Sequence, residues 1–456
     1  MHYPAANTPA DDHGISQRLD ATPLTYLHLL IVFGTGLGLI FDTLEAAMTN
    51  VLATVFATQP GVERSDLTML LVAVFAGGAI GAPLAGRIAD RIGRRASLLI
   101  ALVGYAGASL AAAFAENLSQ LTVLRFVGGM FLAAYPPLMW TYLADVLPPK
   151  ARGKLMMICG GAGSLGSSLA PLLSRWLDAS QPFGFEGWQA TFAVGGLGGL
   201  LVAMLTLKLP ESPRWLASRG RIQASAAQLR RFESSRPLAS ADSAPPAPAP
   251  VESHDTLAPA GQAGRGPDFA KRLTLVMVLQ FFQPLAVIGF AALSGVVLAK
   301  KGHDTHSSLL YVGVASLGAP LGALLASFVI DKLPRHVMFS ICGVVMALLG
   351  LAFGLSTSPA AAMGIGMVYM IFIVLFTMTF NIYVSEMFVT EVRGVAAGAA
   401  YAANRVGAMM VPLLLLPLLL ETGATVMFTA IAATLLLSVA LVWLFGPRDL
   451  AGRALH

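Results

Sequence analysis

The chain has 456 residues, of which 56% are hydrophobic and only 12% are charged. Soluble domains carry roughly 25% charged residues, so this composition excludes an ordinary soluble protein. A helix needs about 20 apolar residues to cross a bilayer, and we therefore expect an all-α polytopic membrane protein. The net charge of +5 gives no nucleic-acid signal, because basic residues beside membrane segments report topology first.

Apolar runs bounded by charged residues, glycine or proline predict twelve transmembrane helices. Each crossing should be helical, because backbone groups facing lipid must be satisfied within their own segment. The first six predicted runs are Leu24–Phe56, Leu67–Ala89, Ala96–Ala115, Leu118–Leu147, Leu155–Leu177 and Trp188–Leu209. The second six are Leu273–Ala299, Ser307–Ile330, Val337–Leu355, Ala360–Met387, Val395–Leu420 and Val426–Phe445.

The apolar runs fall into two groups of six, separated by a polar segment. We expect an N-terminal tail at 1–23, a six-helix bundle at 24–209, a Pro/Ala-rich linker at 210–270, a second six-helix bundle at 271–446 and a tail at 447–456. Most of the 29 Lys and Arg residues lie on the same side as the N-terminus when successive loops alternate sides. The positive-inside rule then predicts that both termini and the linker are cytoplasmic, and we expect the bacterial inner membrane.

The two bundles are predicted to be copies of one unit. Asp90 and Asp331, Tyr142 and Tyr383, and Pro171 and Pro412 are each 241 residues apart. The same offset joins Asp145, Arg152 and Gly153 to Glu386, Arg393 and Gly394. One constant offset in three separate regions indicates a parallel repeat of six helices plus six, with the substrate between the halves. A pathway between two halves of one chain also predicts a monomer.

Two motifs follow helices of the first bundle. The loop after the second helix reads Gly86-Arg-Ile-Ala-Asp90-Arg-Ile-Gly93-Arg94-Arg95, and its second copy departs from this pattern at Ser327, Pro334 and His336. The motif Pro210-Glu211-Ser-Pro-Arg-Trp215 follows the sixth helix. The first motif resembles the loop signature of the major facilitator superfamily. The second is similar to the mark of the branch that holds sugar porters, organic-ion transporters and aromatic-acid/proton symporters. The resemblance implies the major facilitator fold and transport by alternating access.

Charged residues at the ends of helices are expected to form gate networks. Carboxylate–guanidinium pairs there can form in one conformation and break in another. The alternative is that these residues only fix topology and helix ends. The predicted gating residues are Asp90, Arg94, Asp145, Arg152, Glu211, Asp331, Arg335, Glu386 and Arg393.

Ionisable residues inside the membrane are costly, and each is a functional hypothesis. Asp42 and Glu45 are three apart on the first helix, so they share a face and can perturb each other's protonation. Phe41-Asp42-Thr43 resembles the first-helix motif of proton-coupled sugar porters, in which the aspartate works with a fourth-helix arginine, here Arg125. We predict that Asp42, Glu45 and Arg125 couple transport to protons. A static buried ion pair, and for Glu45 a polar cavity wall, remain the alternatives.

Arg405 lies twelve residues beyond Arg393, or about 18 Å along a helix. No acidic residue neighbours it in sequence, so it is a candidate receptor for a carboxylate. The sequence Arg405-Val-Gly with Pro412 resembles the eleventh helix of organic-anion transporters and aromatic-acid symporters. The alternative is a structural partner of Glu45 or Asp42 across the half interface. Other predicted substrate-binding residues are Gln283, Tyr401, Asn381, Tyr383 and Phe282.

We expect a proton-coupled symporter of a small organic anion, a carboxylate, with the lipid bilayer as its surroundings. The sequence shows no motif of an enzyme, a metal site or an ATP-binding loop, so no enzymatic activity, metal or cofactor is expected. A proton-driven antiporter that exports a drug or a metabolite is the first alternative. A sensor that kept the fold and lost transport is the second.

Overall fold

The computed structural model describes residues 10–57, 59–238, 267–330, 332–388 and 390–447. Within these ranges the chain is helical, and the only β-type pairing there is an isolated bridge between Thr25 and Pro237. Twelve of the described helical segments are long and apolar enough to cross a membrane. The predicted all-α fold with twelve spans is therefore confirmed, while most of the Pro/Ala-rich linker and Asp331 lie outside the described residues.

The first six spans closely follow the predicted runs, although two of the runs are broken into two helices each. The helices are α2 (Tyr26–Phe56), α3 (Arg64–Ile92), α4 (Arg94–Ala113), α5 (Leu118–Leu132), α6 (Tyr135–Val146), α7 (Pro149–Gly163), α8 (Leu165–Ser180) and α9 (Gly187–Thr206). A 3₁₀ turn, η1 (Pro182–Gly184), precedes α9. The break before α6 coincides with Pro136 and Pro137, which cannot donate the backbone hydrogen bonds that a continuous helix needs.

The second six spans follow the same plan. They are α12 (Pro267–Lys300), α13 (Thr305–Ser316), α14 (Gly318–Val329), α15 (Arg335–Leu355), α16 (Pro359–Met387), α17 (Thr390–Met410), η2 (Val411–Leu415), α18 (Leu416–Thr422) and α19 (Ala424–Phe445). The segment η2 is a π-helical turn that contains Pro412. Proline removes a backbone donor from the helix, and π-turns are a common way to absorb such an interruption.

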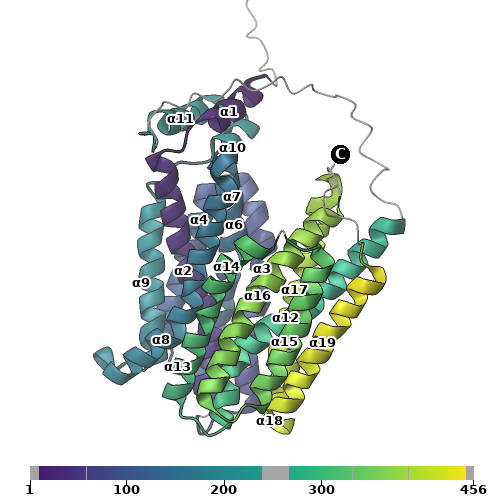
Figure 1. Cartoon of the computed structure of the whole chain (residues 1–456). Coiled ribbons are helices and arrows are strands. Elements are labelled where there is room, and N and C mark those ends of the chain that lie inside the picture. Colours follow the sequence, from purple (N-terminus) through teal and green to yellow (C-terminus); the bar gives the residue numbers. More distant parts are fainter. Residues whose placement is uncertain (1–9, 58, 239–266, 331, 389, 448–456) are drawn as a thin grey trace, which may run out of the picture.

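The two groups of spans lie side by side as two halves of one bundle (Figure 1). We call the end that carries Gly86–Arg95 the signature end and the opposite end the far end. The helices α1 (Ala10–Ala21), α10 (Pro213–Ser218) and α11 (Ile222–Glu233) form a small layer at the signature end, at the top of Figure 1. Figure 1 also shows the halves converging towards the far end and separating towards the signature end.

Close helix packing joins the halves towards the far end. A Cβ atom added at Gly295 of α12 would lie 2.1 Å from the Thr54 hydroxyl of α2. One added at Gly313 of α13 would lie 2.5 Å from the Leu172 side chain of α8. The larger of two apolar cores contains residues of both halves, whereas the smaller contains residues of the N-terminal part of the chain alone. The far end is therefore closed by shared packing.

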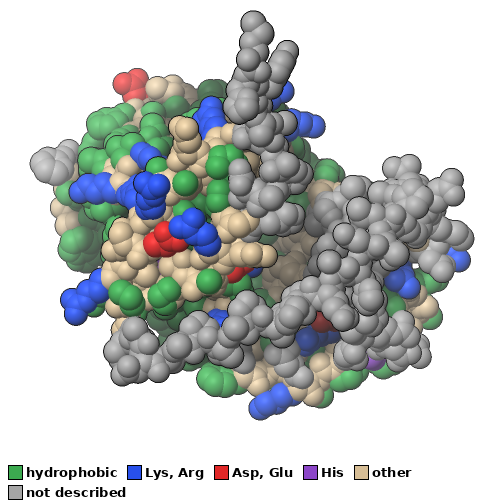
Figure 2. Space-filling view, turned by 90° about the horizontal axis from the view of Figure 1, so that it is seen from above, with side chains coloured by type: hydrophobic (Ala, Val, Ile, Leu, Met, Phe, Trp, Pro, Cys, Tyr) green, Lys and Arg blue, Asp and Glu red, His purple; other side chains and the backbone are tan. Residues whose placement is uncertain are grey.

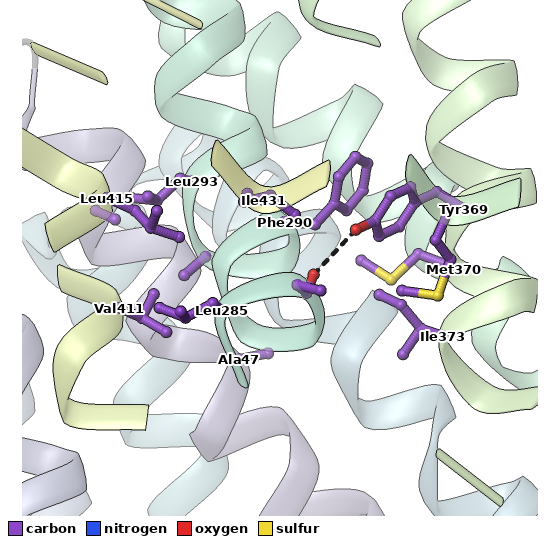
Figure 3. Packing of buried hydrophobic residues seen from close by; sticks show 14 of the residues in the cluster. Ala47, Leu285, Phe290, Leu293, Tyr369, Met370, Ile373, Val411, Leu415 and Ile431 are labelled. Carbon is purple, nitrogen blue, oxygen red and sulfur yellow. Dashed lines mark hydrogen bonds between the residues drawn. The ribbon is translucent and has the colours of Figure 1, made fainter. Parts of the chain in front are cut away.

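The shared core is stiffened by aromatic contacts on α12. Phe290 stacks on Tyr369 of α16 with ring centroids 3.9 Å apart, and the Tyr369 hydroxyl donates to the Ala286 carbonyl at 3.1 Å (Figure 3). Ala47 of α2 lies in the same cluster (Figure 3). The seventh span is thus held by its own half and by the first span at once.

The layer at the signature end packs against the N-terminal half. Ile15 and Leu19 of α1 belong to the same buried core as Leu229 and Phe232 of α11. Lys and Arg side chains gather on this face, beside acidic ones (Figure 2). The N-terminal helix therefore covers part of the first half where the signature loop emerges.

Candidate substrate and proton-coupling site

Glu45 and Arg125 form a buried ion pair inside the N-terminal half. Their side chains are 2% and 3% exposed, and Arg125 Nη1 lies 3.8 Å from Glu45 Oε2. Arg125 also donates to the Thr49 hydroxyl at 2.7 Å and lies over the Phe192 ring, 5.5 Å from its centroid. Glu45 and Thr49 are four residues apart, so α2 presents both on the face that meets α5. In the structure Arg125 therefore pairs with Glu45, and the expected pair between Arg125 and Asp42 is not formed.

Asp42 is 5% exposed, and its Oδ1 atom has no hydrogen-bond partner among the described residues. The cation whose charge acts on Asp42 is Arg405, on α17 of the other half. Arg405 is half-buried, bonds the Tyr401 hydroxyl and lies over the Tyr401 ring at 4.5 Å from the centroid. Its Nε atom has no partner in the described part of the chain. An aspartate and an arginine with spare hydrogen-bonding capacity thus influence each other through charge across the half interface, without a direct ion pair among the described residues.

An amide cluster is centred on Asn404, which precedes Arg405 in the sequence. The Asn404 side chain donates to the side-chain oxygens of Gln280 at 2.9 Å and of Gln283 at 3.1 Å. Gln283 in turn donates to the Thr377 hydroxyl at 3.4 Å. These bonds tie α17 to α12 and α12 to α16, so the amides form a polar cluster between three helices of the second half.

The remaining predicted pocket residues take different positions. Phe282 is half-buried and packs edge-on against Phe281, with centroids 5.4 Å apart. Asn381 is exposed on α16. Tyr383 is buried, and its hydroxyl donates to the Pro447 carbonyl at 3.1 Å. The structure therefore does not bring Tyr383 to Arg405: its hydroxyl is engaged at the end of α19.

Glu211 caps α4 at the signature end. Its carboxylate accepts from the backbone N–H groups of Arg94 at 3.0 Å and of Arg95 at 3.1 Å. Gly93 permits this contact, since its φ of +109° suits glycine and an added Cβ would lie 2.4 Å from Glu211 Oε2. A carboxylate at a helix N-terminus satisfies free N–H groups and meets the positive end of the helix dipole. The loop signature and the motif after the sixth helix are thus two parts of one cap.

The other predicted gating residues of the first half surround this cap. Arg94 donates to Asp90 at 2.8 Å and lies 3.5 Å from Asp145. Arg152 donates to the Leu147 carbonyl at 3.1 Å and lies 3.7 Å from Asp20 of α1. All these contacts join parts of the N-terminal half and the layer that covers it. Whether they break during transport stays a prediction.

The second half has a smaller network in the described residues. Arg335 Nε lies 3.3 Å from Glu386 Oε1. Asp331 and the side chain of Arg393 lie outside what the structure describes. Ion pairs that cross between the halves are found instead at the far end, where Arg64 contacts Glu421 at 2.5 Å and His306 contacts Asp178 at 2.9 Å.

Several residues of this site were not found from the sequence. Ser109 of α4 bonds the Glu45 carboxyl and the Phe192 carbonyl, and nothing in its neighbourhood marks it. Asn404 is adjacent to Arg405, and Thr49 is one helical turn beyond Glu45, so spacing was an available signal for both. Gln280 lies three residues before Gln283, on the same helix face.

Comparison with known proteins places this geometry in a family. A family model described as "Sugar (and other) transporter" matches residues 28–454. A gallate transporter of Pseudomonas putida is 31% identical over 342 residues, covering 73% of this chain and 71% of that protein. The niacin transporter NiaP of Acinetobacter baylyi is 24% identical, covering 96% of this chain and 98% of that protein.

A solved structure supports the fold. The xylose transporter XylE from E. coli, in a partially occluded inward-open conformation, matches with a TM-score of 0.71 at 21% identity. The match covers 92% of this chain and 98% of that one. The chain belongs to the sugar (and other) transporter family of the major facilitator superfamily, and it is an integral membrane transporter and not an enzyme.

Proposed function

We propose that the protein is a proton-coupled symporter that takes up a small organic anion, with an aromatic carboxylate as the preferred substrate. The observation that carries this proposal is Arg405, a half-buried guanidinium at the half interface with an unpartnered Nε. Arginine stays charged in proteins, and an intramembrane cation is costly unless an anion or a polar group meets it. A substrate carboxylate supplies that anion through paired N–H···O bonds.

The surroundings of Arg405 fit an aromatic acid. The Tyr401 ring lies under the guanidinium, and Asn404, the residue before Arg405 on α17, is bonded to the amides of Gln280 and Gln283. An aromatic ring with a carboxyl group would place the charge at Arg405 and ring substituents near the amides. Gallate and niacin, named for two relatives, are both aromatic rings that bear a carboxyl group.

Asp42 is the proposed coupling residue, with Glu45 and Arg125 as a second charged pair beneath it. Ionised Asp42 and a substrate carboxylate would both use the charge of Arg405. Protonation of Asp42 removes this competitor, so proton binding and anion binding favour each other. At Arg405 the substrate carboxylate would take the place of ionised Asp42 as the counter-ion, and this exchange would couple anion uptake to proton uptake.

We assign the signature end to the cytoplasm. Basic residues are concentrated there, as the positive-inside rule requires of the cytoplasmic side. The protein would then function as a monomer in a bacterial inner membrane with both termini in the cytoplasm. The far end, closed in this structure, would face outward.

Proteoliposomes with an internal pH dye test the proposal. Aromatic, aliphatic and sugar-acid carboxylates are added beside organic cations, and an aromatic carboxylate should drive external alkalinisation in the wild type. Arg405→Ala should abolish this flux, and Arg405→Lys should restore part of it because the charge returns without the planar fork. The matched control is Arg175→Ala, which removes another half-buried arginine with an unpartnered Nε and should leave the flux unchanged.

A second variant separates binding from coupling. Asp42→Asn should abolish accumulation driven by a pH gradient and retain exchange of labelled substrate across the membrane. Accumulation that survives in this variant excludes Asp42 as the coupling residue. If only cations move protons and Arg405→Ala has no effect, the anion assignment is wrong and proton-driven export is the better description.

A further inference from the structure

The Glu45 carboxyl occupies a compartment formed by four helices of the N-terminal half. Ser109 reaches it from α4, Arg125 from α5, and Phe192 and Gly195 belong to α9. A Cβ added at Gly195 would lie 2.3 Å from Glu45 Oε1, so only glycine leaves room for the carboxyl there. The carboxyl is thus held on several sides, and its side chain is only 2% exposed.

Ser109 has one hydroxyl hydrogen and two acceptors. Its Oγ atom is bonded to Glu45 Oε1 and lies 2.8 Å from the Phe192 carbonyl oxygen. A hydroxyl donates one hydrogen bond and accepts others. If Glu45 is ionised, the Ser109 hydroxyl donates its hydrogen bond to the carboxylate, and the Phe192 carbonyl receives none from Ser109. If Glu45 is protonated, Glu45 donates to Ser109 and Ser109 donates to Phe192, so both bonds are made at once.

Arg125 has partners in either state. Its Nη1 atom is 3.8 Å from Glu45 Oε2, which is longer than a direct N–H···O bond. Its short bond goes to Thr49 at 2.7 Å, and its guanidinium lies over the Phe192 ring. Arg125 therefore keeps polar and aromatic partners when Glu45 is protonated. A buried charge left without a partner is otherwise the main cost of breaking a buried ion pair.

The other ionisable groups that act on this compartment are few in the described structure. Asp42 lies three residues earlier on α2, and its charge acts on that of Glu45. Tyr105, one turn before Ser109 on α4, interacts with both acids and has a buried hydroxyl without a hydrogen-bond partner among the described residues. The two acids interact with different cations: Arg125 forms an ion pair with Glu45, and Arg405 acts on Asp42 through its charge.

We infer that Ser109 is a positioning residue for a proton on Glu45. By turning between Glu45 and the Phe192 carbonyl, its hydroxyl transmits the protonation state of Glu45 to α9. The proton binds as an O–H bond on the Glu45 carboxylate and leaves by the same bond, while Ser109 keeps its own hydrogen. The inference rests on the proposed proton coupling, because it gives Glu45 a site separate from Asp42 and Arg405. The protonation of Glu45 on α2 is thereby linked to α9, the sixth span, although Ser109 does not contact the substrate.

Infrared difference spectra of the full chain in liposomes, recorded across a pH step, test the inference. A protonated buried carboxyl group gives a carbonyl stretch whose frequency rises when a hydrogen bond is lost. The wild type should show this band, and Glu45→Gln should lack it. Ser109→Ala should shift the band to higher frequency and displace the pH profile of uptake by about one pH unit, the size expected for one charge-assisted hydrogen bond. Ser109→Thr should restore both, because it keeps the hydroxyl.

Ser168→Ala is the matched control, since Ser168 is also buried in the N-terminal half but its hydroxyl has no partner among the described residues. It should leave the band and the profile unchanged. A Ser109→Ala protein that folds, with the band and the profile of the wild type, overturns the inference. A different result would contradict the proposed function, namely the absence of carboxylate-driven proton flux in the wild type. The infrared spectra would still decide the role of Ser109 in that case.

Discussion

At the scale of single residues, the helix contacts of this protein depend on glycines that allow one backbone to touch another. Gly166 of α8 shows this clearly, since an added Cβ would lie 2.0 Å from the Ile40 carbonyl and 2.7 Å from the Leu44 nitrogen of α2. Backbone atoms cannot rotate away as a flexible side chain can. Small residues at helix contacts are the usual means of close packing in membranes.

Gly166→Ala should therefore destabilise the protein by about 1–3 kcal/mol, the usual cost of overpacking a tight contact. Gly107→Ala is the matched control, because Gly107 is also inside a helix but an added Cβ meets nothing within 4 Å. Its change should be neutral or slightly stabilising, since alanine is the better helix former. Thermal unfolding of the purified variants in detergent measures both, and equal midpoints for the two variants would contradict the packing argument.

The same scale shows what the sequence could not reveal about the site. Asp42 and Glu45 share one helix face, and the resemblance of the first-helix motif paired Asp42 with Arg125, whereas the structure pairs Arg125 with Glu45. Which arginine meets which acid depends on how α5 and α17 lie against α2. In this arrangement Arg125 pairs with Glu45, and the charge of Arg405 acts on Asp42. Tyr383 was misplaced for a related reason: its repeat partner Tyr142 donates to the Pro210 carbonyl at 2.6 Å, and Tyr383 makes the equivalent contact with Pro447. The repeat was visible in the sequence, but its structural role was not.

At the scale of elements, the apolar runs predicted all twelve spans because lipid leaves a crossing segment few alternatives to a helix. The small helices at the signature end carry no comparable signal, since α10 and α11 depend on contacts with the bundle. The cap of α4 is one such contact, because Glu211 comes from a segment that follows the sixth span. In the second half Pro334 stands where the first has Gly93, and as the N-cap residue of α15 it has no side-chain group that could accept a capping bond.

Glu211→Ala should destabilise the N-terminal half by about 1 kcal/mol, the usual value of a lost cap. Glu211→Gln should cost less, because the amide keeps one acceptor oxygen and loses only the charge that meets the helix dipole. Hydrogen exchange of the Arg94 and Arg95 amides measures the cap directly and should become faster in the order wild type, Gln, Ala. Glu233→Gln, which alters the exposed pair with Arg18, is the control and should leave these amides protected. Unchanged protection in Glu211→Ala would show that the cap does not hold the start of α4.

At the scale of the whole molecule, the far end is closed by apolar packing and by two ion pairs of different chemistry. Arg64–Glu421 and His306–Asp178 both connect the N-terminal half to the second half. The guanidinium is charged at every accessible pH, whereas histidine changes charge between about pH 5 and 8. Asp304, two residues before His306, adds a second negative charge near this pair. Bonds from the Ser307 hydroxyl and N–H keep the pKa of Asp304 below its usual value, so this charge persists through that range.

Acidification on the far side should therefore stabilise the closed far end, and a rise in pH should weaken it, because only protonated His306 forms an ion pair with Asp178. Spin labels on introduced cysteines at Ser180 and Thr357, both exposed at that end, report the separation of the halves in liposomes. The native Cys159 and Cys342 are buried and should label weakly. The short-distance population should grow as the pH falls from about 8 to 5.

Two variants distinguish the bridges from the acids inside the bundle, which also titrate. His306→Gln should reduce the pH response of the distance and leave only the part that belongs to Asp42 and Glu45. Arg64→Gln should lower the closed population at every pH and keep the response, because its pair with Glu421 does not involve a histidine. A full pH response in His306→Gln would mean that the far end senses protons only through the acids of the membrane interior. A response lost in both His306→Gln and Asp42→Asn would instead show that external and internal protonation act on one closure equilibrium, as a linked two-state transporter requires.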